Sequence, residues 1–265
     1  MRKHAAGIIT AAVIITAILS QVVMASGEVS VLKITGPVQY RISDGDWSPL
    51  STDTKLGEGH SVRTGPDGEA VLTWFAGNVI KLSPLTMMKV DTLKKDEAGS
   101  NKSGIDIAEG RIYAKAAKLA NDDSLFEVRT PTAIAGVRGT AFTVDHDATN
   151  RKSAFVVVEG RVVVTAQDVD QMVEPGHRVS VEINKPPTGP SRVREQEMNR
   201  LRREGKDIDK LVEESSEAGG EESSSLGGEN AEEMADFVAD DIIRQNLDNL
   251  IMEHITAPSG DCCNY

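Results

Sequence analysis

The side chains that most often carry chemistry are few and scattered in this 265-residue sequence. The five histidines are His4, His60, His146, His177 and His254. No two of them have the i, i+4 spacing that places two imidazoles on one face of a helix, so they do not predict a zinc site. We therefore expect these histidines at surface or turn positions, and we expect neither a metal nor a cofactor.

Two short acidic segments, Asp44-Gly45-Asp46 and Asp145-His146-Asp147, contain the oxygen ligands that calcium prefers. Neither begins the graded series of carboxylates that makes a calcium loop, so we interpret both as turns. The serines form no Gly-x-Ser-x-Gly elbow, and no pairing of a nucleophile with a base is visible. The sequence therefore predicts no enzyme, although carboxylates that meet only in the folded chain, as in a glycosidase, stay a weaker alternative.

The densest group of turn-forming residues is the segment Thr130–Phe142, which reads TPTAIAGVRGTAF. It lacks the Gly-Lys-Ser/Thr ending of a phosphate-binding loop and a following helix, so it does not predict nucleotide binding. Gly136 and Gly139 allow a positive φ or a close backbone approach, Pro131 fixes a turn, and Thr140 can bond to nearby backbone. We expect its members to define shape, with partner contact as the alternative: Thr130, Pro131, Thr132, Gly136, Val137, Arg138, Gly139 and Thr140.

Arg138 has the most hydrogen-bond donors in this segment. Its guanidinium could clamp carbonyl groups at a corner of the fold, or it could contact a ligand directly. The structural role is favoured, and Arg138 is the best single residue to test. No ligand-binding residue is assigned beyond this segment.

Aromatic residues make up only 4% of the chain, and flat aromatic side chains on a surface could stack on sugars. Trp74 has apolar neighbours at Leu72 and Phe75, so we expect it in the core. Exposed rings at Trp47 or Tyr113 would indicate a module that binds cell-wall glycan.

The elements that must position these residues are short strands, bounded by Gly, Pro, Asp and Asn about every ten residues. Glu-Gly-Arg followed by an apolar residue occurs at both 109–112 and 159–162, and recurrence of a turn and a strand is typical of stacked coils. We therefore predict an all-β fold that is β-solenoid-like, with twisted stacked β-coils. The expected strands include Val29–Ile34, Ala70–Phe75, Val79–Leu82, Phe126–Thr130, Ala141–Val144, Ala154–Val158 and Val162–Thr165.

The N-terminus has the layout of a secretory signal peptide, because Arg2, Lys3 and His4 precede an apolar or small run from Ala5 to Leu19. That run is short for a helix that crosses about 30 Å of hydrocarbon. A cleaved signal peptide is therefore favoured over a retained anchor, and we expect an exported protein in the periplasm or cell envelope.

Charge and composition divide the rest of the chain. The formal net charge is -12, which disfavours nucleic acid as a partner. Ser215–Asn230 is mostly Ser, Gly and Glu, a composition typical of disorder. The neighbouring Cys262 and Cys263 lie too near the end to staple the core. The expected parts are a signal peptide or N-terminal anchor (1–25), a β domain (28–185), a charged helix (191–214) capped by Ser191, a disordered acidic linker (215–230), an amphipathic helix (231–256) and a tail (257–265).

Residues 130–142 closely resemble the signature of FecR domains, T-P-x-A-x-A-G-V-R-G-T-x-F. Shorter matches follow in the family's order, among them Gly36-Pro37-Val38, Gly68-Glu69-Ala70 and Glu109-Gly110-Arg111. The resemblance covers roughly Glu28 to Ile183. It implies a β-solenoid-like domain on the outer side of the inner membrane, whose relatives pass signals from outer-membrane iron transporters to sigma factors by protein contact.

Such regulators carry a cytoplasmic sigma-binding segment before their membrane helix, whereas only Met1 to His4 precede the apolar run here. We therefore expect a stand-alone exported FecR domain. The predicted function is a non-enzymatic binding or scaffold module for an envelope protein. A glycan-binding module is the alternative, and a carboxylate-dependent hydrolase ranks below both. Membrane contact is expected only through the N-terminal segment, if it is retained.

Overall fold

The computed structural model describes residues 27–75, 77–95, 100–117 and 124–221. These residues are mostly β-structure with one C-terminal helix, α2, so the predicted β-rich fold is confirmed. The sheet does not close on itself, and the stacked-coil arrangement stays a prediction. The elements are β1 (Val29–Thr35), β2 (Val38–Ile42), β3 (Ser48–Pro49), β4 (Lys55–Leu56), β5 (His60–Thr64), β6 (Glu69–Trp74), β7 (Asn78–Leu82), β8 (Met87–Lys95), β9 (Asn101–Lys115), β10 (Leu125–Arg129), β11 (Ile134–Val137), β12 (Ala141–Asp147), β13 (Lys152–Glu159), β14 (Val162–Ala166), β15 (Val169–Val173), β16 (His177–Glu182), β17 (Ser191–Arg192) and α2 (Glu195–Glu221).

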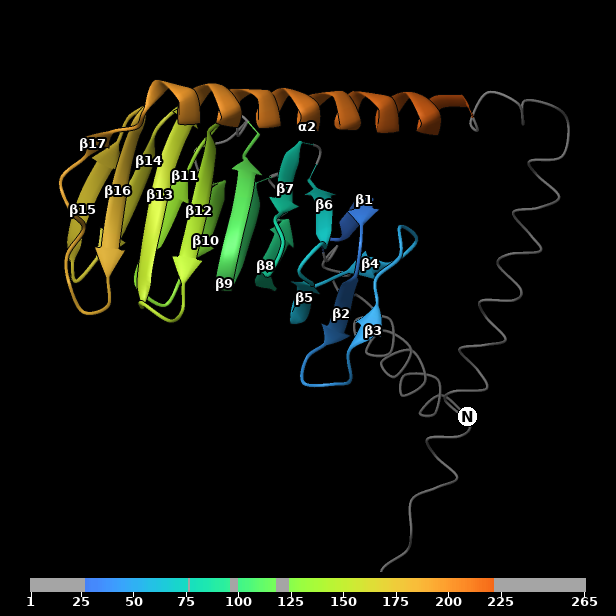
Figure 1. The fold of residues 1–265 in the computed structure, drawn as a ribbon. Coiled ribbons are helices and arrows are strands. Elements are labelled where there is room, and N and C mark those ends of the chain that lie inside the picture. The colour runs from blue at the N-terminus through green and yellow to red at the C-terminus, as the bar shows by residue number, and fades with distance from the viewer. Residues whose placement is uncertain (1–26, 76, 96–99, 118–123, 222–265) are drawn as a thin grey trace, which may run out of the picture. The chain divides into compact units, whose positions relative to one another are not determined.

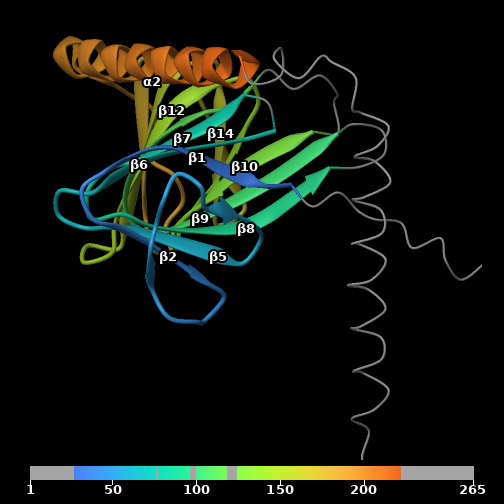
Figure 2. The same cartoon turned by 90° about the vertical axis from the view of Figure 1, so that its right-hand side faces the viewer.

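The strands form two layers that β9 joins (Figures 1 and 2). Sheet A has the order β3-β2-β5-β8-β9-β10-β11-β14-β15. Sheet B has the order β4-β1-β6-β7-β9-β12-β13-β16-β17. The first part of β9 pairs in sheet A and its last six residues, from Gly110 to Lys115, pair in sheet B. These pairings are antiparallel except for β9 with β10, which is parallel.

The core lies between the layers, because alternate residues of each strand point inward. Phe126, Phe142 and Phe155 are fully buried there. Phe126 meets Trp74 edge to face at 5.5 Å between ring centroids, and it meets Phe142 at 6.5 Å. Trp74 is 3% exposed and its Nε1 donates a hydrogen bond to Ser103 Oγ at 3.0 Å. The expected core position of Trp74 is confirmed.

Helix α2 crosses the outer face of sheet B (Figures 1 and 2). Met198, Leu201 and Ile208 recur at spacings that bring them to one side of a helix, and they are buried against the sheet. Gly205 marks the closest approach, since a Cβ atom there would lie 2.4 Å from the Tyr113 hydroxyl. Sheet B therefore buries apolar side chains on both of its faces, whereas sheet A buries them only on its inner face in the described part of the chain.

The helix begins and ends later than the sequence indicated. Ser191 does not cap it, because Ser191–Arg192 pairs with β16 as a short edge strand. The helix also continues through 215–221, a segment for which the sequence predicts a disordered linker. Adding one residue to an existing helix is much easier than starting a new one, so a packed helix can extend into a weakly helical segment.

The remaining predicted segments lie outside the described residues. These are the signal peptide or anchor (1–25), the rest of the linker (222–230), the amphipathic helix (231–256) and the tail (257–265). Within the ranges that the structure describes, no helix is both long and apolar enough to cross a membrane.

Candidate functional site

The signature segment connects the two sheets. Its first half follows β10 and includes β11, both in sheet A, and its last two residues begin β12 in sheet B. Side chains alternate along β11, so Ala135 and Val137 are buried in the core while Ile134 and Gly136 face outward from sheet A. The segment therefore contributes to both the core and an outer face.

The turn between β10 and β11 is closed by Thr130. The Thr130 backbone N–H donates to the Ala133 carbonyl at 2.9 Å, and the Thr130 hydroxyl oxygen accepts from the Ala133 N–H at 3.1 Å. Ser153 of β13, which is fully buried, donates to Thr130 Oγ1 at 2.9 Å and accepts from Thr132 Oγ1 at 2.7 Å. Hydroxyl groups thus tie the turn after Thr130-Pro131 in sheet A to a strand of sheet B.

His146 belongs to the same network, with Nδ1 2.9 Å from Ser153 Oγ. Because the Ser153 hydroxyl donates to Thr130, Nδ1 is the donor in this contact. His146 is 3% exposed, and burial lowers its pKa. The surface or turn position that we expected for it is wrong, and so is the turn predicted at Asp145-His146-Asp147, because these residues end β12. The alternation Phe142, Val144, His146 could have placed it on the inward side of β12.

The corner after β11 depends on Gly139 and Thr140. Gly139 has φ +61°, and the buried Thr140 hydroxyl donates to the Arg161 carbonyl at 2.9 Å. Gly160 has φ +77°, and a Cβ atom on it would lie 2.7 Å from the Gly139 carbonyl oxygen. A side chain at Gly160 would therefore force two stretches of backbone apart.

The same corner occurs earlier in the chain. Thr86 Oγ1 donates to the Arg111 carbonyl at 3.0 Å, Gly110 has φ +90°, and its Cβ would lie 2.5 Å from the Leu85 carbonyl oxygen. The recurring Glu-Gly-Arg sequence therefore marks a repeated threonine–glycine corner.

Two other signature residues face outward. Gly136 has no positive φ, and no atom lies within 4 Å of the position of a Cβ. The strained or close-packed backbone that we expected there is absent. Arg138 is exposed, at the start of the corner. Neither residue fills the core, so packing of the core alone does not explain their place in the signature.

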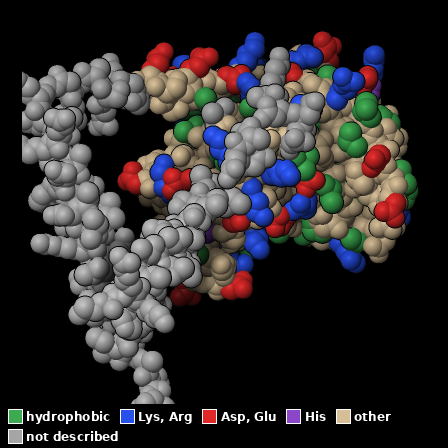
Figure 3. All heavy atoms as spheres, turned by 180° about the vertical axis from the view of Figure 1, so that it is seen from behind, with side chains coloured by type: hydrophobic (Ala, Val, Ile, Leu, Met, Phe, Trp, Pro, Cys, Tyr) green, Lys and Arg blue, Asp and Glu red, His purple; other side chains and the backbone are tan. Residues whose placement is uncertain are grey.

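The outer face of sheet A carries exposed apolar side chains around Gly136. Ile134 is 40% exposed and Met172 is 51% exposed, and Val163 lies between them in partial burial. Gly136 pairs with Val163, which pairs with Met172, so the four residues are neighbours on three strands. We call Ile134, Gly136, Val163 and Met172 the sheet A patch. Figure 3 shows exposed hydrophobic side chains among charged ones on this side.

A groove of about 400 Å³ lies beside the patch on the same face. Arg129, directly opposite Ile134 in the pairing of β10 with β11, forms one wall. Its guanidinium binds Asp91 and Glu127, each at 2.5 Å, and lies 3.9 Å from Asp106. The groove is lined by Arg41, Ser61, Met87, Met88, Lys89, Asp106, Ile107, Ala108, Arg129, Thr130 and Pro131.

The acidic groups around Arg129 titrate differently. Burial raises the pKa of Asp106, and the negative charge of Asp91 adds to this. Burial alone would raise the pKa of Asp91 too, but hydrogen bonds from Arg129 and Thr92 outweigh it and lower that pKa. Of these carboxylates only Asp106 lines the groove, so no acid–base pair faces across it. No cluster of His, Cys, Asp or Glu in the described ranges could hold a metal ion.

The two aromatic rings considered for glycan contact have different surroundings. Tyr113 is 2% exposed beneath α2, and burial raises its pKa. Trp47 is partly exposed, but the guanidinium carbons of Arg41 and Arg63 lie 4.8 and 4.2 Å from its ring centroid. Arg63 is held in turn by Gln39 Oε1 at 2.7 and 2.9 Å. Tyr113 therefore offers no platform, and arginines already stack on Trp47.

Comparison with known proteins finds a family model that matches the region containing the signature. The family model described as "FecR protein" matches residues 60–163, from β5 into β14. No protein of curated function matches the sequence. Two crystal structures from Parabacteroides distasonis ATCC 8503, each described as a "putative anti-sigma factor", are similar at 20% and 19% identity with TM-scores of 0.43 and 0.44. The alignments cover 51% of this chain and 61% of each of those chains. The predicted resemblance to FecR domains is confirmed by the family model over residues 60–163.

Proposed function

We propose that this protein is a non-enzymatic binding module of the cell envelope, and that it recognises a partner protein with the outer face of sheet A. The observation that carries the proposal is the difference between the two outer faces. Helix α2 buries the outer face of sheet B, whereas the outer face of sheet A keeps the exposed sheet A patch and the adjoining groove. Exposed apolar patches with a polar rim are typical of protein interfaces.

The position of the signature supports this use of sheet A. Its buried residues hold the turn and the corner, and its outward residues Ile134 and Gly136 form the centre of the patch. Gly136 leaves a flat site between larger side chains, which a partner side chain could fill. The rim has both charge signs, with Arg129 and Glu127 on one side and Asp170 on the other. Export is supported by the N-terminal sequence alone.

The test is crosslinking from intact envelopes, with a photoreactive residue on sheet A and with the double variant Ile134→Asp, Met172→Asp. A matched control is Leu85→Asp, because Leu85 is 62% exposed and lies in the β7–β8 turn, off the patch. Circular dichroism must first show that each variant is folded. We expect a protein that the parent and the control capture and that the double variant loses.

Equal capture by all three proteins would remove sheet A as the interface. Binding to sacculi without any captured protein would favour the glycan alternative, for which the partly exposed Trp47 is the remaining candidate of the two rings considered. Arg138→Ala distinguishes the two roles of the signature arginine, since lost capture with unchanged stability would place Arg138 in the interface.

A further inference from the structure

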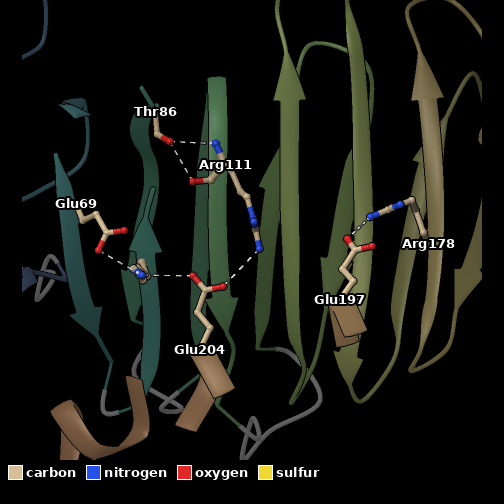
Figure 4. A network of polar contacts seen from close by, with 7 residues as sticks. Glu69, Thr86, Arg111, Arg178, Glu197 and Glu204 are labelled. Carbon is tan, nitrogen blue, oxygen red and sulfur yellow. Dashed lines mark hydrogen bonds and ion pairs between the residues drawn. The ribbon is translucent and has the colours of Figure 1, made fainter. Parts of the chain in front are cut away.

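Helix α2 has acidic side chains paired with sheet B on one side and exposed basic side chains on the other. Three of its acidic residues reach sheet B, and of these Glu204 is 15% exposed and bridges Lys81 Nζ at 3.5 Å and Arg111 Nη2 at 3.4 Å (Figure 4). Glu197 and Asp209 also pair with cations of the sheet. These ion pairs neutralise the acids of the helix along the line where it meets the sheet.

The basic residues of the same turns face solvent. Arg200, Arg202, Arg203 and Lys206 are exposed, and none has an ion-pair partner in the part of the chain that the structure describes. Between residues 199 and 210 of the helix, Asp207 is the one acidic residue that is exposed. We call these four cations the outer basic face of α2. A protein with a net charge of -12 thus presents a local excess of positive charge.

Two hollows adjoin this face, and Arg203 lines both. One is a groove of about 1000 Å³ between α2 and strands β1, β6, β7 and β9, whose lining includes Lys33, Arg200, Arg203 and Lys210 together with the acids Glu69, Glu204, Asp207 and Glu214. Lys81 and Arg111 also line it, but Glu204 already binds them. The other hollow, about 480 Å³ in size, is lined by Gln196, Asn199, Arg202, Arg203 and Lys206. Its lining contains three cations and two amides but no acid.

We propose that the outer basic face of α2 binds a soluble polyanion that carries closely spaced phosphate groups. Guanidinium groups donate paired hydrogen bonds to phosphate oxygens, and the amides of Gln196 and Asn199 add neutral donors. A phosphate monoester carries a charge of about -1.5 to -2 at pH 7, which matches three neighbouring cations better than one carboxylate does. The site is separate from the sheet A patch and does not depend on its partner.

A membrane surface fits this face less well. Helices that lie in a membrane interface insert apolar side chains between the lipids. Among the described apolar residues of α2, Met198, Leu201 and Ile208 are buried against sheet B, and Leu211 and Val212 are partly buried against the same cluster. The outer basic face therefore has charge and hydrogen-bond donors, but no apolar side chain to insert.

The test measures binding of inorganic tripolyphosphate to the protein purified from the cell, by titration calorimetry at several salt concentrations. The variant is Arg202→Gln, Arg203→Gln, Lys206→Gln. The matched control is Lys94→Gln, Lys95→Gln, Lys102→Gln, which removes the same charge from exposed positions of β8 and β9 in sheet A. All six positions are exposed, so the fold should survive, and circular dichroism checks this.

We expect the α2 variant to lose about tenfold or more in affinity, since charge-assisted hydrogen bonds are among the stronger polar contacts. Its affinity should also depend less steeply on salt, because fewer counterions are displaced. The control should bind like the parent. An equal loss of affinity in both variants would show that binding depends only on net charge and would refute the site. Absence of binding by the parent protein would refute it as well. Binding to phosphatidylglycerol vesicles without binding to tripolyphosphate would assign the face to a membrane and overturn the proposal.

Discussion

Replacement of Gly160 by Ala is the sharpest test of the threonine–glycine corner, because the chain contains a matched control. Gly160 and Gly176 have nearly the same backbone conformation, with φ +77° and φ +79°. They differ in what a Cβ atom would meet. At Gly160 it would lie 2.7 Å from the Gly139 carbonyl oxygen and 2.8 Å from Thr140 Oγ1, whereas at Gly176 nothing lies within 4 Å.

The conformational part of the effect is common to both substitutions. An L-residue in this left-handed region costs about 1–2 kcal/mol, and the gain from a stiffer unfolded chain is also shared. Only Gly160→Ala adds overpacking, which costs about 1–3 kcal/mol when a well-packed site must shift. The neighbours include backbone atoms that cannot rotate away. We therefore expect Gly160→Ala to lose about 1–3 kcal/mol more unfolding free energy than Gly176→Ala.

Urea denaturation followed by far-UV circular dichroism measures this difference, provided that both variants keep the parent's slope. The Thr140→Val variant serves as a second probe of the same corner, because it removes the hydroxyl that reaches the Arg161 carbonyl. Equal losses for the two glycine variants would refute the close approach at Gly160. The repeated corner would then have no steric basis.

Three further predictions concern ion pairs, the hydroxyl network and pH. Glu204→Gln removes both ion pairs that Glu204 makes with the sheet and should cost about 1 kcal/mol in urea denaturation, against almost none for the exposed Glu195→Gln. Ser153→Ala leaves buried partners unsatisfied and should cost about 1–3 kcal/mol by the same assay. The lowered pKa of His146 means that the unfolded chain binds this proton more tightly, so stability should fall as pH drops below about 6.5. His146→Asn should weaken that fall between pH 7.5 and 5.5; an unchanged pH profile would contradict the assignment.

The strands could be predicted because their signal is local. Alternation of apolar residues and Gly or Asn turns identified strands that overlap β1, β6, β7, β12 and β13. The core position of Trp74 followed from its apolar neighbours in the same way. Burial of His146 does not follow from its residue type, whereas the period of two along β12 places it in line with the buried Val144.

The arrangement of α2 could not be predicted from local patterns. Its apolar residues are few, and only contact with outward side chains of sheet B, such as Val156 and Tyr113, makes them sufficient. The close contact at Gly205 also depends on tertiary structure. Glycine is unfavourable inside a helix, so the sequence alone gives no reason for its position there. The same holds for the sheet A patch, because Gly136, Val163 and Met172 come together through strand pairing across 36 residues of sequence.

The two outer faces explain why the signature cannot be assigned a single role. Ala141 at its end is buried beneath α2 on sheet B, whereas Ile134 near its beginning is exposed on sheet A. A substitution at Ala141 must displace the helix before it can affect a partner, so it acts on stability first. A substitution at Ile134 removes little buried area, so a loss of binding there reflects the surface itself. Stability and capture measured together on these two residues therefore separate the part of the signature that builds the fold from the part that meets a partner.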